Sequence, residues 1–372
     1  MKEKNIIIFY PSFERGGVEQ NLINLINNFD KSFNIYLISS IDSNYSKKIF
    51  KNKNLKILKI PVTKIYNLLP DRFNTAISAI KILNDLITKL KKKRLIIHSM
   101  QSNIAAILVC LIRNVKIVIR NSEDPIYSTV HAENRLVSLL VFFLKLIFYN
   151  LCSGIITNSN GSKNSLSKFV VNNKKIKAIY NPYLKKLNTT KYKKKNFIIN
   201  IGRFRKQKNQ IILLKAFYNF QKKFKKFKLI LVGDGILKNK LKEEVLRLKL
   251  DKKVVFTGWT ENSKKYLKKS KIFVLSSLYE GLGNVLIDSI NYDVPCISTD
   301  CQSGPREILL NGKGGFLVKN NNIEELSNKM IYCQKNYKLA LKKTKISKQS
   351  LKRFLMTKRV KEYEKYLLNF EN

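Results

Sequence analysis

The sequence has few of the residues that build metal centres and disulfide frameworks. Its 372 residues include two histidines and five cysteines, and the cysteines form no pairs at zinc-binding spacing. An odd number of scattered thiols fits a reducing compartment better than a disulfide framework. We therefore expect packing roles for all five cysteines, which are Cys110, Cys152, Cys296, Cys301 and Cys333.

Targeting signals and long apolar runs are also scarce. Met1 to Lys4 leads straight into a short strand-like run, without the apolar region and cleavage site of a signal peptide, so we expect a cytoplasmic protein. The most apolar segment, Leu136 to Tyr149, holds one charge, Lys145, in fourteen residues. It is shorter than the roughly 20 residues that span a bilayer. We expect a buried core helix here, with a helix at a membrane interface as the alternative.

Acidic residues are few relative to basic ones. The chain has 25 Asp and Glu against 72 Lys and Arg, a net charge of +47. Because 44% of the residues are hydrophobic, this charge does not indicate a disordered chain. Two interpretations stay open, compositional drift toward lysine and adsorption to anionic lipid, where each lysine near the surface contributes about 1 kcal/mol. No recognition motif predicts a nucleic-acid partner.

Short apolar runs alternate with helical patterns along the whole chain, which predicts a doubly wound α/β fold. The length fits two domains. A proline and a lysine-rich stretch after Asn181 mark a linker, so we place one domain at 1–182, a second at 183–350 and a final helical segment at 351–372. The expected strands are 5–10, 34–39, 55–60, 95–98, 116–119, 154–158 and 176–180, then 197–201, 229–232, 254–256, 272–275, 295–298 and 315–318.

The stretch from Ser276 to Leu310 gives the clearest indication of a ligand-binding site. An apolar run ends at Ser276, a loop containing Glu280, Gly281 and Gly283 follows, and helical spacing then resumes. Backbone N–H groups at a helix start favour a negatively charged group such as phosphate. The carboxylate of Glu280 is free to accept hydrogen bonds from hydroxyls. Phosphate and hydroxyls together indicate a nucleotide-sugar ligand.

Two further glycine loops follow expected strands of the second domain. Gly202 is followed by Arg203 and Lys208, and a guanidinium together with an ammonium suits a diphosphate. Gly233 lies in a Val-Gly-Asp-Gly turn that brings backbone close to a planar base or ribose. A plain tight turn is the alternative interpretation of Gly233.

Polar residues also follow strands of the first domain, where open α/β sheets bind ligands. Gly16 and Gly17 precede an amphipathic helix, although no G-x-G-x-x-G pattern is present. His98 and Arg120 come directly after expected strands. For His98 the alternatives are a ligand contact and a satisfied strand-end histidine, and for Arg120 a ligand contact and an ordinary ion pair.

Taken together, these motifs resemble the retaining glycosyltransferases of family four, which have the GT-B fold. The resemblance covers nearly the whole chain and is closest to members that build bacterial surface polysaccharides and lipid-linked oligosaccharides. It implies two Rossmann-like domains that face a cleft, with the acceptor bound by the first, the nucleotide-sugar bound by the second and a last helix crossing back to the first. The segments that carry it are Gly16–Glu19, Tyr180–Pro182, Gly202-Arg203 with Lys208, Val232–Gly235, Ser276–Gly281 and Gly304–Ile308.

The resemblance also implies roles for individual residues. Arg203 and Lys208 match positions that stabilise the leaving diphosphate without a metal ion or other cofactor. Glu280 matches the first acid of an E-x7-E pair and contacts the donor sugar, whereas Asp288 replaces the second acid, which binds ribose. The further expected donor contacts are Gly233, Gly281, Leu282, Gly283 and Asn284.

In the first domain, the resemblance implies that Gly16 and Gly17 let the chain close onto the diphosphate. Many relatives have a histidine near the reacting carbon after the fourth or fifth strand. The matching segment here has no histidine, so that role stays open between His98 and Arg120.

The expected activity is therefore the retaining transfer of a hexose or N-acetylhexosamine from a UDP-sugar to a hydroxyl of a growing glycan. The expected location is the cytoplasmic face of an anionic membrane. A non-catalytic nucleotide-sugar-binding protein would lose Arg203, Lys208 or Glu280, and all three are present. A nucleic-acid-binding protein would gather its basic and aromatic residues on one face, whereas the lysines here are spread throughout.

Overall fold

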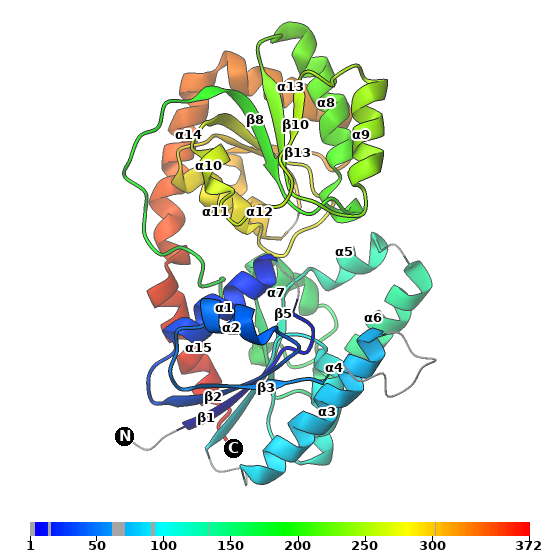
Figure 1. The fold of residues 1–372 in the computed structure, drawn as a ribbon, viewed down its shortest axis with the longest axis vertical. Coiled ribbons are helices and arrows are strands. Elements are labelled where there is room, and N and C mark those ends of the chain that lie inside the picture. Colours follow the sequence, from blue (N-terminus) through cyan, green and yellow to red (C-terminus); the bar gives the residue numbers. More distant parts are fainter. Residues whose placement is uncertain (1–3, 14–15, 62–70, 91–93, 133, 302) are drawn as a thin grey trace. The chain divides into compact units, whose positions relative to one another are not determined.

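The computed structural model describes residues 4–13, 16–61, 71–90, 94–132, 134–301 and 303–372. Residues 14–15 of the expected loop before Gly16, and Gln302 of the Ser276–Leu310 stretch, lie outside these ranges. The chain divides into two units (Figure 1). Unit 1 comprises 1–129, 134–185 and 354–372, and unit 2 comprises 130–133 and 186–353.

Unit 1 is built on a parallel seven-stranded sheet with the strand order β3-β2-β1-β4-β5-β6-β7. Ile7 at its centre pairs with Tyr36 on one side and Ile97 on the other. The apolar runs expected to form strands in this region all do so, because a sheet covered on both faces requires continuous apolar strands. The strands are β1 Lys4–Phe9, β2 Phe33–Ser39, β3 Leu55–Lys59, β4 Leu95–Ser99, β5 Val118–Asn121, β6 Gly154–Thr157 and β7 Ile176–Ala178.

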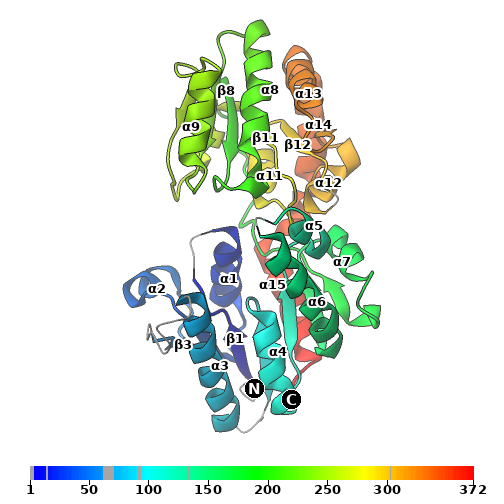
Figure 2. The ribbon, with the colours of Figure 1, turned by 90° about the vertical axis from the view of Figure 1, so that its right-hand side faces the viewer.

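Helices cover both faces of this sheet (Figure 2). On one face α1 and α15 share a core with the strands, and on the other α3, α4, α6 and α7 do so. The apolar stripe expected near the C-terminus is buried at Val360, Tyr363 and Leu367, so the last helix packs on the first sheet, as expected. The helices are α1 Gly17–Asn28, α2 Ser43–Ile49, α3 Asp71–Lys89, α4 Asn103–Ile112, α5 Pro125–Val130, α6 Arg135–Leu151, α7 Asn160–Leu166, the short η1 Asn173–Lys175 and α15 Met356–Leu368.

The core prediction for the segment 136–149 is wrong. This segment lies within α6, of which Tyr149 is the one buried residue, while several of its large apolar side chains are exposed. The helix is apolar around most of its circumference, and only one of its sides packs against α4 and the rest of the unit 1 core. Within the described residues, none of the helices is long and apolar enough to cross a membrane.

Unit 2 repeats the architecture with a parallel six-stranded sheet in the order β10-β9-β8-β11-β12-β13. Its strands are β8 Lys195–Ile201, β9 Lys228–Val232, β10 Val254–Phe256, β11 Ser270–Leu275, β12 Cys296–Thr299 and β13 Phe316–Val318. Its helices are η2 Lys206–Lys208, α8 Gln210–Lys223, α9 Lys238–Arg247, α10 Lys264–Leu267, α11 Asn284–Asn291, α12 Gly304–Ile308, η3 Leu310–Gly312, α13 Ile323–Lys335 and α14 Tyr337–Ser350, followed by η4 Leu351–Phe354. Two consecutive doubly wound domains confirm the α/β prediction.

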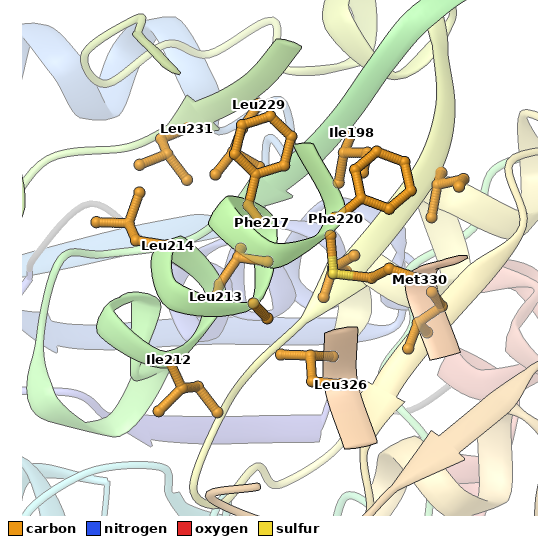
Figure 3. Packing of buried hydrophobic residues seen from close by; sticks show 14 of the residues in the cluster. Ile198, Ile212, Leu213, Leu214, Phe217, Phe220, Leu229, Leu231, Leu326 and Met330 are labelled. Carbon is orange, nitrogen blue, oxygen red and sulfur yellow. The ribbon is translucent and has the colours of Figure 1, made fainter. Parts of the chain in front are cut away.

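The core of unit 2 lies between its sheet and the helices α8 and α13 (Figure 3). Phe217 and Phe220 of α8 lie near Leu229 of β9, and Met330 of α13 belongs to the same buried cluster. These aromatic and aliphatic side chains are almost fully removed from solvent. Ile198 of β8 pairs with Ile272 of β11, and both side chains belong to this cluster, which therefore supports both strands.

All five cysteines are buried and free of disulfide bonds. Burial raises the pKa of Cys110, Cys152, Cys301 and Cys333 to about 12, so these thiols stay protonated at neutral pH. Burial also raises the pKa of Cys296. The packing roles expected for the cysteines agree with these surroundings.

Candidate active site

Lys208 and Glu280 meet at the carboxyl end of the unit 2 sheet. Lys208 ends η2 in the loop after β8, and Glu280 lies in the loop after β11, which is the neighbour of β8 in the sheet. Lys208 Nζ lies 2.5 Å from Glu280 Oε1. The Glu280 side chain is 8% exposed and that of Lys208 19%. Two residues that we assigned to the donor from separate motifs therefore form one partly buried ion pair.

Hydrogen bonds tie the two loops to each other. The Leu278 N–H donates to the carbonyl of Gln207 at 2.8 Å, and the Gln207 side-chain amide donates to the carbonyl of Tyr279 at 3.1 Å. The Ser276 hydroxyl donates to the carbonyl of Lys208 at 2.8 Å. Because these bonds involve main-chain groups on both loops, they set the distance between Lys208 and the loop of Glu280 independently of the ion pair.

The carboxylate of Glu280 is held at one oxygen. Oε1 accepts from the Ser277 hydroxyl at 2.6 Å as well as from Lys208. The Ser303 hydroxyl donates to the main-chain carbonyl of Glu280. Among the described residues, Oε2 has no hydrogen-bond partner. A carboxylate oxygen has two acceptor positions, so Oε2 can receive hydroxyl donors from a ligand.

The loop after Glu280 leads into α11 through a left-handed glycine. Gly283 is the N-cap residue of this helix with φ +83°, and no side chain caps the helix there. The Gly304 N–H donates to the carbonyl of Gly281 at 3.1 Å, and a Cβ on Gly304 would lie 2.2 Å from the Leu282 Cα. Leu282 itself is buried, whereas Gly283 and Asn284 are partly exposed. The loop thus presents backbone at the positive end of the α11 dipole.

Two more glycines allow close contact between the loops after β8 and β9. Gly233 has φ +150°, and a Cβ there would lie 2.0 Å from the Gly202 carbonyl oxygen. The stem of Lys208 lies over Gly202, 3.4 Å from the position of a Cβ. Arg203 is partly exposed in the same loop, and its carbonyl accepts from the Gln210 side chain at 3.2 Å. The carboxyl end of the sheet therefore brings together Gly202, Arg203, Lys208 and Gly233.

Asp288 lies on α11, one helix turn beyond its first residue. Its side chain is buried, and its Oδ1 is 3.8 Å from Nζ of Lys264 on α10. Because the Lys264 side chain is half exposed, this long ion pair is accessible to solvent on one side. A contact between Asp288 and ribose stays a prediction.

In unit 1, His98 is the fourth residue of β4 and is fully buried. Its Nδ1 lies 3.0 Å from the Val118 carbonyl, and its Nε2 has no partner among the described residues. Burial, with a smaller contribution from the nearby charge of Arg120, lowers the pKa of His98 to about 3, so the imidazole is neutral at physiological pH. No part of the ring reaches the surface to contact a ligand.

Arg120 at the end of β5 is also buried. Its guanidinium donates to the hydroxyl of Tyr363 on α15 and to the side-chain oxygen of Asn181, and its Nε donates to Ser122 Oγ at 3.0 Å. These three partners are neutral groups rather than the acid of an ordinary ion pair. Arg120 therefore connects the C-terminal helix and the turn at Asn181 to the sheet.

The glycine pair of unit 1 begins a helix, as expected. Gly16 is the N-cap of α1 with extended backbone, and Gly17 is its exposed first residue. The acid that follows, Glu19, is buried and accepts a 2.8 Å hydrogen bond from the Tyr10 hydroxyl. The pair is thus accessible at a helix N-terminus, whereas Glu19 is occupied in packing α1 onto β1.

Two family models match nearly the whole chain. The model described as Glycosyltransferase Family 4 matches residues 15–183, and that described as Glycosyl transferases group 1 matches residues 185–350. An uncharacterized glycosyltransferase of Methanocaldococcus jannaschii is 32% identical over 327 residues, which are 82% of this chain and 71% of that protein. The chain belongs to the family-four glycosyltransferases.

Other similarities of this glycosyltransferase agree with the assignment. The Campylobacter jejuni enzyme N-acetylgalactosamine-N,N'-diacetylbacillosaminyl-diphospho-undecaprenol 4-alpha-N-acetylgalactosaminyltransferase is 30% identical over 260 residues, covering 68% of this chain and 70% of that one. The crystal structure of Staphylococcus aureus TarM in complex with fondaparinux, alpha-GlcNAc-glycerol and UDP has a TM-score of 0.76 at 15% identity, covering 99% of this chain and 100% of that one. The structural similarity confirms the GT-B fold.

Sequence reasoning missed the side chains that support the site of this glycosyltransferase. Ser277 lies within the Ser276–Gly281 motif, yet nothing in the sequence marked its hydroxyl as a donor to Glu280. Gln207 lies between Arg203 and Lys208, and only the adjacency of β8 and β11 brings it to the loop of Glu280. The order of strands in the sheet was the missing information.

Proposed function

We propose that this glycosyltransferase moves a hexose or N-acetylhexosamine from a UDP-sugar to a hydroxyl of a growing lipid-linked or surface glycan, with retention at the anomeric carbon. The observation that carries the proposal is the contact of Lys208 with Glu280 in the loop that leads into α11. The name of the C. jejuni relative, a transferase acting on a diphospho-undecaprenol glycan, supports this acceptor class. The UDP bound to the TarM neighbour supports the nucleotide.

In this proposal the second domain, residues 183–350, binds the donor. Lys208 Nζ has three N–H groups, and its hydrogen bond to Glu280 uses one of them, which leaves donors for the diphosphate. Arg203 adds a guanidinium that binds phosphate oxygens in pairs, and the amides at Gly283 and Asn284 add the helix dipole. Such preorganised donors act where negative charge develops on the leaving group, and each is worth about 3 kcal/mol of activation free energy.

The sugar-transfer step follows from these roles. The acceptor hydroxyl attacks the anomeric carbon on the face that the diphosphate leaves, so a new C–O bond forms as the bond to the phosphate oxygen breaks. The bonding electrons go to the diphosphate, and the hydroxyl proton passes to one of its oxygens. Glu280 Oε2 accepts hydrogen bonds from the donor sugar, and the Asp288 carboxylate accepts hydrogen bonds from the ribose hydroxyls. No metal ion takes part in this step.

The first domain, residues 1–182, binds the acceptor in this proposal, and Gly16 and Gly17 present the N-terminus of α1 to the diphosphate. The burial of His98 and Arg120 supports positioning roles for both residues rather than contact with the reacting carbon. The proposal also includes peripheral contact with the cytoplasmic face of an anionic membrane. The net charge of +47 supports this contact.

The deciding experiment incubates the purified enzyme with UDP-, GDP- and ADP-sugars and measures nucleotide release with and without a lipid-diphosphate glycan. We expect UDP release that the acceptor accelerates. The product's anomeric configuration, read from its proton NMR coupling, should equal that of the donor. Release of GDP or ADP instead would overturn the donor assignment, and an inverted product would overturn retention.

A further inference from the structure

The outward side of α6 is apolar along its whole length. Leu136, Leu140, Phe143, Ile147 and Leu151 are 81%, 61%, 61%, 58% and 50% exposed. Their spacing of four, three, four and four residues places them in one line on a helix of 3.6 residues per turn. We call these five residues the α6 stripe. A surface helix normally puts polar and charged residues on this side.

The inward side of α6 holds the charge that the outward side lacks. Lys145 lies two residues after Phe143, on the opposite side of the helix, and it is partly buried, which lowers its pKa. Phe142 packs edge-on against Phe169 at 5.3 Å between ring centroids. Tyr149 is buried, and its hydroxyl accepts from the Asn103 side chain at 3.2 Å. Lys145 therefore lies on the partly buried side of α6, whereas the outward side is apolar.

The neighbouring helix α4 extends this apolar surface. It packs beside α6 on the same face of the unit 1 sheet (Figures 1 and 2). Leu108, Leu111 and Ile112 are 42% to 80% exposed on its outer side. The ten residues of α4 include no charged side chain. Two adjacent helices thus turn apolar side chains toward solvent.

Basic residues surround both helices. Between Asn103 and Ala178 the chain has ten Lys and Arg against three Asp and Glu. Arg113 follows α4, Arg135 begins α6, and Lys175 Nζ donates to the carbonyls of Asn150 and Cys152 at the end of α6, at 2.7 and 2.9 Å. Arg120 is buried and Lys145 lies on the inward side of α6, but the other eight of these basic residues are at least partly exposed and, with the overall charge of +47, favour contact with anions.

The charge decides which partner fits the apolar surface. A second copy of this chain would bring two charges of +47 together, and self-repulsion of that size opposes association. An anionic bilayer instead attracts the basic residues and accepts apolar side chains below its headgroups. The combination of an apolar stripe with basic flanks and no acid on either helix is the pattern of a helix that lies in a membrane interface.

We propose that the α6 stripe, together with Leu108, Leu111 and Ile112 of α4, inserts into the headgroup region of an anionic phospholipid bilayer with α6 parallel to the membrane plane. The inference rests on the membrane contact of the proposed function and names the surface that makes it. It brings unit 1, which contains the proposed acceptor-binding domain, to the surface where a lipid-linked acceptor is anchored.

The first test is co-sedimentation with vesicles that contain phosphatidylglycerol and phosphatidylcholine. The variant Leu140→Gln/Phe143→Gln/Ile147→Gln should lower the partition coefficient by more than about tenfold, because three exposed apolar side chains lose their insertion energy. The control Ile236→Gln/Leu246→Gln changes two exposed apolar residues of unit 2 and should leave binding unchanged. Both variants should keep the wild-type melting temperature, since the changed side chains are largely solvent-exposed.

The second test uses the single tryptophan of the chain, Trp259 in unit 2. In a Trp259→Phe background, Phe143→Trp should shift its emission to shorter wavelength on anionic vesicles, whereas Leu246→Trp should not. If the triple variant binds the vesicles as well as the wild type does, the assignment of the surface is overturned. If the wild type forms a dimer without lipid and the triple variant is a monomer, the surface binds a second copy of the chain and the membrane assignment is overturned.

Failure of the inference can be told from failure of the proposed activity. If the wild-type protein does not bind anionic vesicles, both the proposed inserted surface and the proposed membrane contact are overturned. Nucleotide release measured with a detergent-solubilised acceptor would then still test the glycosyl transfer by itself. The triple variant should keep that activity in detergent, because none of its three residues belongs to the proposed donor or acceptor contacts.

Discussion

Lys208 Nζ and Glu280 Oε1 lie 2.5 Å apart although 72 residues separate them in the sequence. The pair connects the cation proposed for the leaving diphosphate with the acid proposed for the donor sugar. Each side chain orients the other, so the two positions are expected to act as a unit.

We predict that Lys208→Ala and Arg203→Ala each lower kcat by about a hundredfold to a thousandfold, because a preorganised donor at the leaving group is worth about 3 kcal/mol. Nucleotide release from the preferred sugar donor measures the effect. Lys206→Ala is the matched control, since Lys206 is an exposed lysine in the same short helix η2 and should leave kcat within about twofold. Near-normal turnover of Lys208→Ala in a folded protein would contradict the assignment.

A double-mutant cycle on Lys208→Ala and Glu280→Ala should be strongly non-additive. Removing either partner leaves the other without its ion pair, so the double variant should lose little more activity than the worse single variant. The measurement is kcat/KM for all four proteins, with thermal unfolding recorded in parallel. Additive effects on kcat/KM would mean that the two residues act independently, against the contact in this structure.

Gly233→Ala should destabilise unit 2 by more than about 2 kcal/mol, because its Cβ would overlap the Gly202 carbonyl oxygen and the main chain must move. Gly258→Ala is the control, since Gly258 also has positive φ but no heavy atom lies within 4 Å of the added Cβ. Only the backbone cost of about 1 to 2 kcal/mol applies there. Urea unfolding compares the two variants, and an equal loss would show that the Gly202–Gly233 contact adds nothing.

The stability of the protein should fall on acidification through His98. Its pKa is about 3 in the folded state against an ordinary value of 6.5, so the unfolded chain binds the extra proton between these values. Stability from this group is complete above pH 6.5 and declines by about 1.4 kcal/mol per pH unit toward pH 3. Urea unfolding at pH 7 and pH 5 measures the decline.

The variant His98→Asn separates this titration from other acid effects. Its side-chain amide can still donate to the Val118 carbonyl, but it does not titrate, so the difference in stability between pH 7 and pH 5 should shrink. His131→Asn is the comparison, because burial also lowers the pKa of His131, but this histidine is half-buried and its removal should reduce the pH dependence less. An unchanged pH dependence in His98→Asn would contradict the lowered pKa.

The strands could be predicted from the sequence because their physics is local. Runs such as Ile6–Tyr10 and Ile272–Leu275 are apolar at every position, as required of strands covered on both faces. Glycines and polar residues at their ends marked the loops. Glu280, Gly283 and Lys208 were therefore found as loop residues before any contact between them was known.

The contacts could not be predicted, because they depend on which strands are neighbours and on which side of a helix packs. Nothing in the sequence places Gln207 against the carbonyl of Tyr279, or Arg120 between Asn181 and Tyr363. The segment 136–149 shows the same limit for a helix. Its apolar residues surround the helix axis, so periodicity could not identify Tyr149 as buried and Leu136 as exposed.

The return of α15 to unit 1 sets an order for folding during synthesis. The core that α15 shares with α1 stays incomplete until Met356, Val360 and Leu367 have left the ribosome, whereas every residue of unit 2 is made before them. Unit 2 can thus finish folding first, although its main segment begins at Lys186. A nascent chain released before Tyr363 would leave the Arg120 guanidinium without one of its hydrogen-bond acceptors. It would also uncover the part of the first sheet that α15 covers beside α1, a state that quality-control proteases recognise.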